Sequence, residues 1–170
     1  MRAKLISEHI NFEKKRDTLS SLGVGQRKLI KDWLDKMEIK NYKINDDFTI
    51  DIIKDDVIIP HKGLTELPFY INFRKVDGSF YCYENELTTL RGCPIKSFNF
   101  SCRNNHLYSL KWAPEYVSNI FSCYCNHLTS LEYLPKHIGG SIYCGDNDVM
   151  FTKEQVKKYC DQKNNNNIYV

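Results

Sequence analysis

The sequence predicts an α+β solenoid of about five coils, with a helix and a β-hairpin at its N-terminal end and a helix at its C-terminal end. A short pattern recurs four times at intervals of 20 or 21 residues, an amphipathic helical pattern precedes the repeats, and a helix-capping motif follows them. A period in this range gives one unit too little chain for a core of its own. Successive units must therefore bury their apolar faces against one another.

The repeated unit is an apolar residue, Cys two positions later, Asn three after that and an aliphatic residue two further on. It occurs at residues 80–87, 100–107, 121–128 and 142–149. The alternation of the apolar residue with Cys is typical of a half-buried strand. In three units a leucine and then a proline follow, at Pro94, Pro114 and Pro135. These prolines are expected where the chain returns, outside the strand pairing.

The asparagines and cysteines each hold one position of the unit. We expect the amides of Asn85, Asn105, Asn126 and Asn147 to bond backbone groups of adjacent coils. The column of Cys82, Cys102, Cys123 and Cys144 should point inward as small, reduced, buried hydrophobes. In Cys123-Tyr124-Cys125 the alternation sends the two sulfurs to opposite faces, so we expect no metal site. No cofactor is predicted.

A degenerate coil precedes the four clear copies. Its apolar residues have the same spacing as the apolar residue, the Cys and the two leucines of the next unit, shifted by 23 residues. They are Val57, Ile59, Leu64 and Leu67. An atypical first coil is expected where a solenoid meets its cap. The predicted division is therefore an N-terminal helical and β-hairpin cap over 1–56, a solenoid over 57–149, and a C-terminal helix with an Asn-rich tail over 150–170.

Both ends carry signals for capping elements. An apolar stripe predicts an amphipathic helix over 25–38, with Leu29, Ile30, Trp33, Leu34 and Met37 facing inward. Residues 42–52 are predicted to form a strand, a turn and a second strand. Thr152 with Gln155 forms a capping box, which predicts a helix from about Lys153 to Gln162.

The unit resembles the leucine-rich repeat, with Phe or Ile and then Cys in the two strand leucine positions. The short period and the phrase from Leu128 to Leu131 are similar to the short repeats of bacterial effectors and of proteins encoded by tailed phages. Residues 11–17 and 22–25 resemble openings of tailed-phage proteins. The resemblance covers about 57–149 and implies a leucine-rich-repeat-like solenoid that binds a protein. Such effectors can carry a ubiquitin-ligase domain after the repeats, and we expect none after Val149.

Composition excludes several classes of function. Net charge is only +3, and no apolar run approaches membrane-spanning length. The start lacks the apolar core of a secretory signal, so we expect a cytoplasmic protein, in the bacterial host if phage-encoded. Weak nucleic-acid binding is an alternative that interleaved acidic residues disfavour. It would use the basic residues of the first third, Lys14, Lys15, Arg16, Arg27, Lys28 and Lys31.

The candidate site is the outward face of the repeat strands. Residues on either side of each Cys should project from it, and five of them are aromatic or Arg: Tyr81, Tyr83, Arg103, Tyr124 and Tyr143. Tyr and Arg often anchor protein interfaces, whereas cross-strand aromatic ladders also simply stabilise sheets. We predict a non-enzymatic protein-binding module without catalytic residues. A phage virion or structural accessory protein, and self-association through open solenoid edges, remain alternatives.

Overall fold

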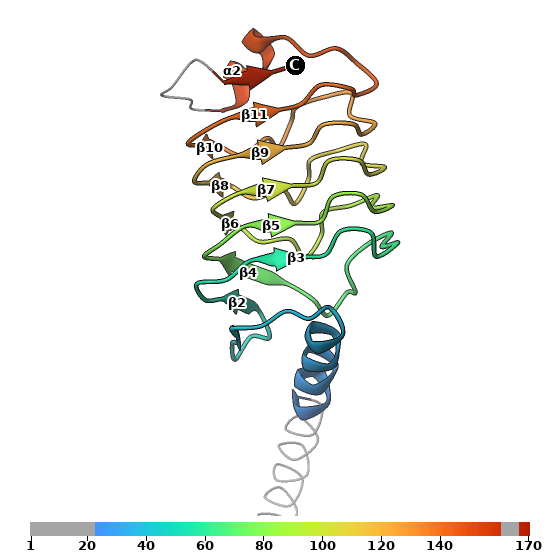
Figure 1. Cartoon of the computed structure of the whole chain (residues 1–170), viewed down its shortest axis with the longest axis vertical. Helices are drawn as coiled ribbons and strands as arrows, with labels where there is room; N and C mark the ends of the chain where they lie inside the picture. Colours follow the sequence, from blue (N-terminus) through green and yellow to red (C-terminus); the bar gives the residue numbers. More distant parts are fainter. Residues whose placement is uncertain (1–22, 161–166) are drawn as a thin grey trace, which may run out of the picture.

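The computed structural model describes residues 23–160 and 167–170 of the chain. Coils stack in sequence order from the N-terminal helix at one end to the C-terminal segments at the other (Figure 1). With a helix near each end and parallel strands through every coil, the fold is the predicted α+β solenoid of five coils.

One parallel sheet, the repeat sheet, carries the predicted strands. Each repeat's apolar residue pairs with its equivalent in the next coil, as Phe80 does with Phe100 and Phe100 with Phe121. Val57 pairs with Phe80 in the same register, which confirms the degenerate first coil. In spatial order the strands are β12 (Ile168–Tyr169), β11 (Ile142–Tyr143), β9 (Phe121–Ser122), β7 (Phe100–Ser101), β5 (Phe80–Tyr81) and β3 (Val57–Ile58).

A second sheet, the return sheet, was not predicted beyond its first hairpin. β1 and β2 form the expected antiparallel hairpin, and β2 then pairs in parallel with β4, so the predicted cap shares this sheet with the coils. The remaining strands lie in segments predicted only as linkers. The sheet runs β1 (Tyr42–Ile44), β2 (Ile50–Ile52), β4 (Phe73–Val76), β6 (Lys96–Ser97), β8 (Tyr116–Val117) and β10 (His137–Ile138).

The core lies between the two sheets. The rings of Phe80, Phe100 and Phe121 stack along the solenoid with centroids 5.7 and 5.8 Å apart and planes 9° from parallel. Towards the N-terminal end, Phe73 meets Phe80 edge-on at 5.3 Å, and Trp33 lies 6.4 Å from Phe73. All five side chains are buried, so the aromatic column joins the cap to the coils.

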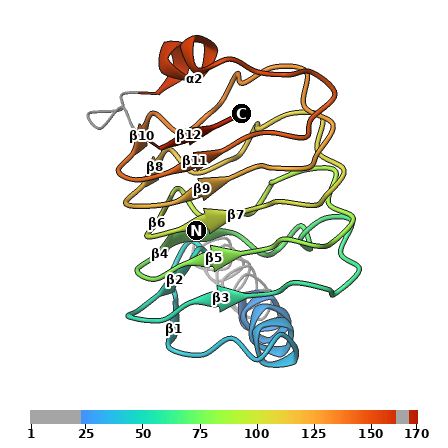
Figure 2. The same cartoon turned by 45° about the horizontal axis from the view of Figure 1, so that its top comes forward.

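The N-terminal helix, over residues 23–36, lies beyond the first coil at the N-terminal end of the stack (Figures 1 and 2). Ile30, Trp33, Leu34 and Met37 are buried as predicted, but Leu29 is 51% exposed. The helix ends earlier than predicted because Glu38 adopts a left-handed conformation, with φ of 59°. The N–H of Glu38 donates to the carbonyl of residue 35, and that of residue 39 to the carbonyl of Leu34, which is a Schellman motif.

The C-terminal end is closed by a helix and a strand. Helix α2 (Lys153–Tyr159) begins with the predicted capping box, and Val156 and Cys160 are buried. The predicted end at Gln162 and most of the Asn-rich run lie outside the described residues. The sequence reasoning missed β12, which pairs with β11 and extends the repeat sheet by one strand.

The cysteine column is buried as predicted, and its thiols are free. The Sγ–H groups of Cys82 and Cys102 donate to the carbonyls of Ser101 and Ser122 in the next coil, at 3.6 and 3.5 Å. Burial raises the pKa of the Cys102 and Cys123 thiols well above the usual value, and that of Cys144 to about 11. Thiols held protonated in this way are poor nucleophiles.

We therefore expect a single fast-reacting thiol in the native protein. Cys125 is the one exposed cysteine, while the other six are buried. A thiol reagent should modify about one equivalent rapidly, and Cys125→Ser should remove that phase without unfolding the protein. Mass spectrometry of the quenched reaction identifies the labelled residue. Rapid labelling of Cys102 or Cys123 would contradict the buried column.

Candidate binding face

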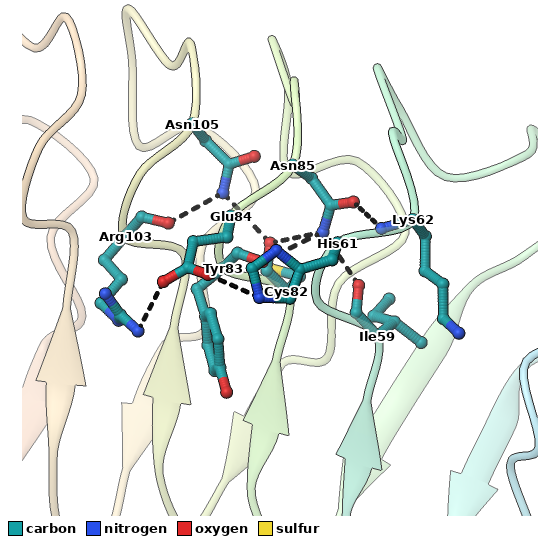
Figure 3. A network of polar contacts seen from close by, with 9 residues as sticks. All are labelled: Ile59, His61, Lys62, Cys82, Tyr83, Glu84, Asn85, Arg103 and Asn105. Carbon is teal, nitrogen blue, oxygen red and sulfur yellow. Dashed lines mark hydrogen bonds and ion pairs between the residues drawn. The ribbon is translucent and has the colours of Figure 1, made fainter.

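An asparagine ladder fixes the turn that follows each repeat strand. The Nδ2 group of Asn105 donates to the carbonyls of Cys82, Cys102 and Arg103 at 3.1, 3.0 and 3.3 Å, and its Oδ1 accepts from the N–H of Leu87 at 2.9 Å. Equivalent bonds surround Asn85, Asn126 and Asn147. Figure 3 shows how Asn85 and Asn105 reach from one coil to the next. The predicted inter-coil bonds are confirmed.

The residue two after each Cys takes a left-handed conformation. Glu84, Asn104, Cys125 and Asp146 have φ of 54°, 52°, 55° and 50°. Asn and Asp adopt this conformation more readily than other residues with a side chain, so Asn104 and Asp146 were the available signal, and the sequence reasoning did not use it. The tight turn starts immediately beyond the strand and leaves the outward side chains around Cys unobstructed.

The five predicted site residues meet around one shallow hollow of about 490 Å³. Tyr81 and Tyr143 occupy the position before Cys, and between their coils the same position holds Ser101 and Ser122. These two serines are only 8% and 7% exposed, so they form the floor. The rest of the lining is Tyr83, Arg103, Tyr124 and Ile120.

The serines and Ile120 were not among the predicted site residues. The recurrence of Ser before Cys in two adjacent coils was the signal for a depression between larger side chains. In the part of the chain that the structure describes, no protein group pairs with the hydroxyl of Ser101 or Ser122. Both hydroxyls therefore remain available for a group that enters the hollow.

Arg103 is held in place by its neighbours. Its guanidinium lies 2.8 Å from the carboxylate of Glu84 and 4.5 Å from the ring centre of Tyr83. The same carboxylate contacts His61 at 2.6 Å, so Glu84 links three successive coils (Figure 3). Tyr83 in turn lies 6.0 Å from Tyr81, ring centre to ring centre. One edge of the hollow is therefore a connected polar and aromatic network.

The other tyrosines are also anchored. The hydroxyl of Tyr124 donates to the carboxylate of Asp146, and this hydrogen bond raises the pKa of the phenol. Tyr143 stacks on Tyr169 of β12 with ring centres 4.6 Å apart. Asn99 donates to the hydroxyl of Tyr81 at 3.3 Å. Every predicted site side chain thus has a partner that restricts its rotamers.

The polar groups of this face do not form a recognisable catalytic set. His61 pairs with Glu84, and His127 pairs with Asp148 at 3.0 Å. Over residues 23–160 and 167–170 neither imidazole bonds a serine, threonine or cysteine side chain, the arrangement that activates a nucleophile. Nor do three or more His, Cys, Asp or Glu side chains gather there in a way that could hold a metal ion.

The basic N-terminal segment is only partly described. Lys14, Lys15 and Arg16 lie outside the described residues. Arg27 donates to the carbonyls of Ile44 and residue 45 at 3.0 and 3.1 Å, so it fastens the helix to the β1–β2 hairpin. Lys28 and Lys31 are exposed.

Comparisons of the chain with protein-family models, curated proteins and solved structures gave no match. Within the described ranges, the structure has no helix whose length and apolar character would let it cross a bilayer.

Proposed function

We propose that this protein is a non-enzymatic binding module that docks a protein partner on the outward face of its repeat sheet. The observation that carries the proposal is that four tyrosines and one arginine, from four successive coils, surround a single hollow. Tyrosine and arginine are enriched among the residues that dominate binding energy at protein interfaces. A hollow with hydroxyls on its floor and rings on its walls suits an inserted side chain of a partner.

The arrangement of the tyrosines favours binding over a purely structural role. A stabilising ladder needs rings in adjacent coils, as in the pair Tyr143 and Tyr169. Ser101 and Ser122 separate Tyr81 from Tyr143, so these rings stand three strand spacings, about 14 Å, apart. That interruption removes the ladder at the centre of the face and leaves the hollow in its place.

The rigidity of the face also supports the proposal. Side chains that are already held in one rotamer lose little conformational entropy when a partner binds. Arg103 is fixed by Glu84 and Tyr83, and Tyr124 by Asp146. The face is therefore ordered before contact, as expected for a surface that recognises a partner of fixed shape.

The resemblance to leucine-rich repeats of bacterial effectors and tailed-phage proteins makes the proposal more concrete. On that basis the partner is a host protein met in the bacterial cytoplasm. A virion component is the second possibility of this kind, and it would use the same face. A nucleic-acid partner is disfavoured, because the hollow contains one arginine and that arginine is paired with Glu84.

Site-specific photo-crosslinking tests the proposed face. A photoreactive phenylalanine analogue replaces Tyr124 in one variant and Tyr108 in another, and each is expressed in the native host. Tyr108 is an exposed tyrosine that does not line the hollow, so it is the matched control. We expect one protein to crosslink from position 124 and not from position 108. Equal crosslinking from both positions, or crosslinking from 108 alone, would contradict the assignment.

A further inference from the structure

A second surface lies at the corner where each coil turns towards the return sheet. The residue two positions after the second leucine of the repeat is Gly92, Trp112 or Tyr133, and all three have positive φ, of 87°, 75° and 68°. Glycine adopts this conformation without strain, whereas a bulky side chain rarely does. The fold therefore favours glycine at this position, and two coils carry large aromatic residues instead.

The fold gains little from these two rings. Trp112 and Tyr133 are 55% and 52% exposed, and neither stacks on another aromatic ring of the described residues. The ammonium of Lys111 lies 5.3 Å from the ring centre of Trp112. A strained backbone that carries an exposed aromatic side chain is the kind of outlier that points to a ligand.

Both rings line one hollow of about 550 Å³, and its lining residues come from four successive coils. Its walls include two of the repeat prolines and several aliphatic side chains, notably Pro94, Pro114, Ile95 and Leu134. Aromatic rings next to apolar walls form the type of groove in which proline-rich segments dock in the polyproline II conformation.

The charge of this corner groove narrows the choice of occupant. Three cations, Arg91, Lys111 and Lys136, lie in or beside the groove with two carboxylates, Glu115 and Glu132, so positive charge exceeds negative by one. Lys136 pairs with Glu115 at 3.3 Å, whereas Lys111 and Arg91 have no carboxylate partner among the residues that the structure describes.

We infer that the corner groove binds an extended, proline-containing acidic segment of a protein, at a site separate from the repeat-sheet face. Trp112 and Tyr133 pack against the prolines of that segment, and Lys111 and Arg91 attract its carboxylates. The residue types at the strained position are explained by this ligand and not by the stability of the coil.

Fluorescence anisotropy with defined peptides tests the inference. The probe is a fluorescein-labelled 12-residue peptide of Glu-Pro-Pro repeats, and the controls are Lys-Pro-Pro and Glu-Gly-Ser repeats of equal length. We expect saturable binding of the Glu-Pro-Pro peptide only. Trp112→Gly and Tyr133→Gly should each weaken it at least tenfold, whereas Arg103→Ala on the repeat-sheet face should leave it unchanged.

The glycine variants also give a test that needs no ligand. Because glycine fits the left-handed position, both variants should melt at the same temperature as the parent protein or higher. A lower melting temperature for Trp112→Gly would show that the ring is structural and would overturn the inference. No saturable binding of the Glu-Pro-Pro peptide, equal binding of the Lys-Pro-Pro peptide, or full binding by Trp112→Gly would overturn it as well.

Discussion

Phe100→Ala should lower the free energy of unfolding by about 3–5 kcal/mol, the largest effect expected of any single substitution considered for this chain. Phe100 is fully buried and is stacked between Phe80 and Phe121 at 5.7 and 5.8 Å. Removing the ring opens a cavity in the middle of the aromatic column. A solenoid has no other contacts there to compensate, because each coil touches only its neighbours.

Phe98→Ala is the matched control for this substitution. Phe98 lies only two residues before Phe100 but is 47% exposed, so its loss should change stability far less. Chemical denaturation followed by circular dichroism gives both free energies. Similar losses in the two variants would show that the stacked phenylalanines are not the core of the fold.

Asn105→Ala should be the second most damaging change, with an expected loss of about 3 kcal/mol. The substitution leaves the buried N–H of Leu87 unpaired, and it removes one of the two amide donors of the Cys82 carbonyl, which keeps its bond from Asn85. An unpaired buried backbone group costs about 1–3 kcal/mol. The bonds to its own coil, to the carbonyls of Cys102 and Arg103, are lost as well.

Two further variants make the asparagine prediction specific. His106→Ala changes an exposed neighbour of Asn105 and should have little effect. Asn147→Ala should cost less than Asn105→Ala, because Asn147 is only half-buried and water can replace some of its bonds. The expected order of stability losses in thermal and denaturant melts is therefore Asn105, Asn147, His106. An unchanged melt for Asn105→Ala would mean that the ladder does not hold the coils together.

The repeat sheet was predictable because its determinants recur at one spacing. In each of the four clear repeats the apolar residue, Cys, Asn and the aliphatic residue keep one position, so four weak signals support one another. The same reasoning located Val57 and Ile59 in a coil that lacks the Asn. The core and the asparagine bonds followed directly from that register.

The return sheet could not be predicted in the same way. Its strands are two residues long in most coils, and their inward positions hold Ser97, Val117 and Ile138, which share no side-chain type. The pairing there is imposed by the stacking of the coils rather than by local preference. For β12 a signal did exist, because Ile168-Tyr169 repeats the dipeptide Ile142-Tyr143 of β11.

The sequence predicted which residues lie on the outward face, but not the shape of the surface that they form. Alternation along the strands gave the outward positions, and the structure places all five predicted side chains around one hollow. The floor went unrecognised because Ser101 and Ser122 carry no chemical signal of their own. Their importance comes from the larger side chains on both sides. The strained aromatic corners at Trp112 and Tyr133 were missed as well. A glycine at a repeat position can indicate a positive φ, but an aromatic residue at that position gives no such indication.

The affinity of the crosslinked partner for a double variant tests the central proposal most directly. Arg103→Ala with Tyr124→Ala should weaken binding of the purified partner by about 2 kcal/mol or more, roughly thirtyfold, if these side chains are central anchors. The melting temperature should change little, since both side chains are on the surface. Glu132→Ala, an exposed change away from the hollow, should bind as the parent protein does. Unchanged affinity in the double variant, with a loss in Glu132→Ala, would place the binding site elsewhere and contradict the account.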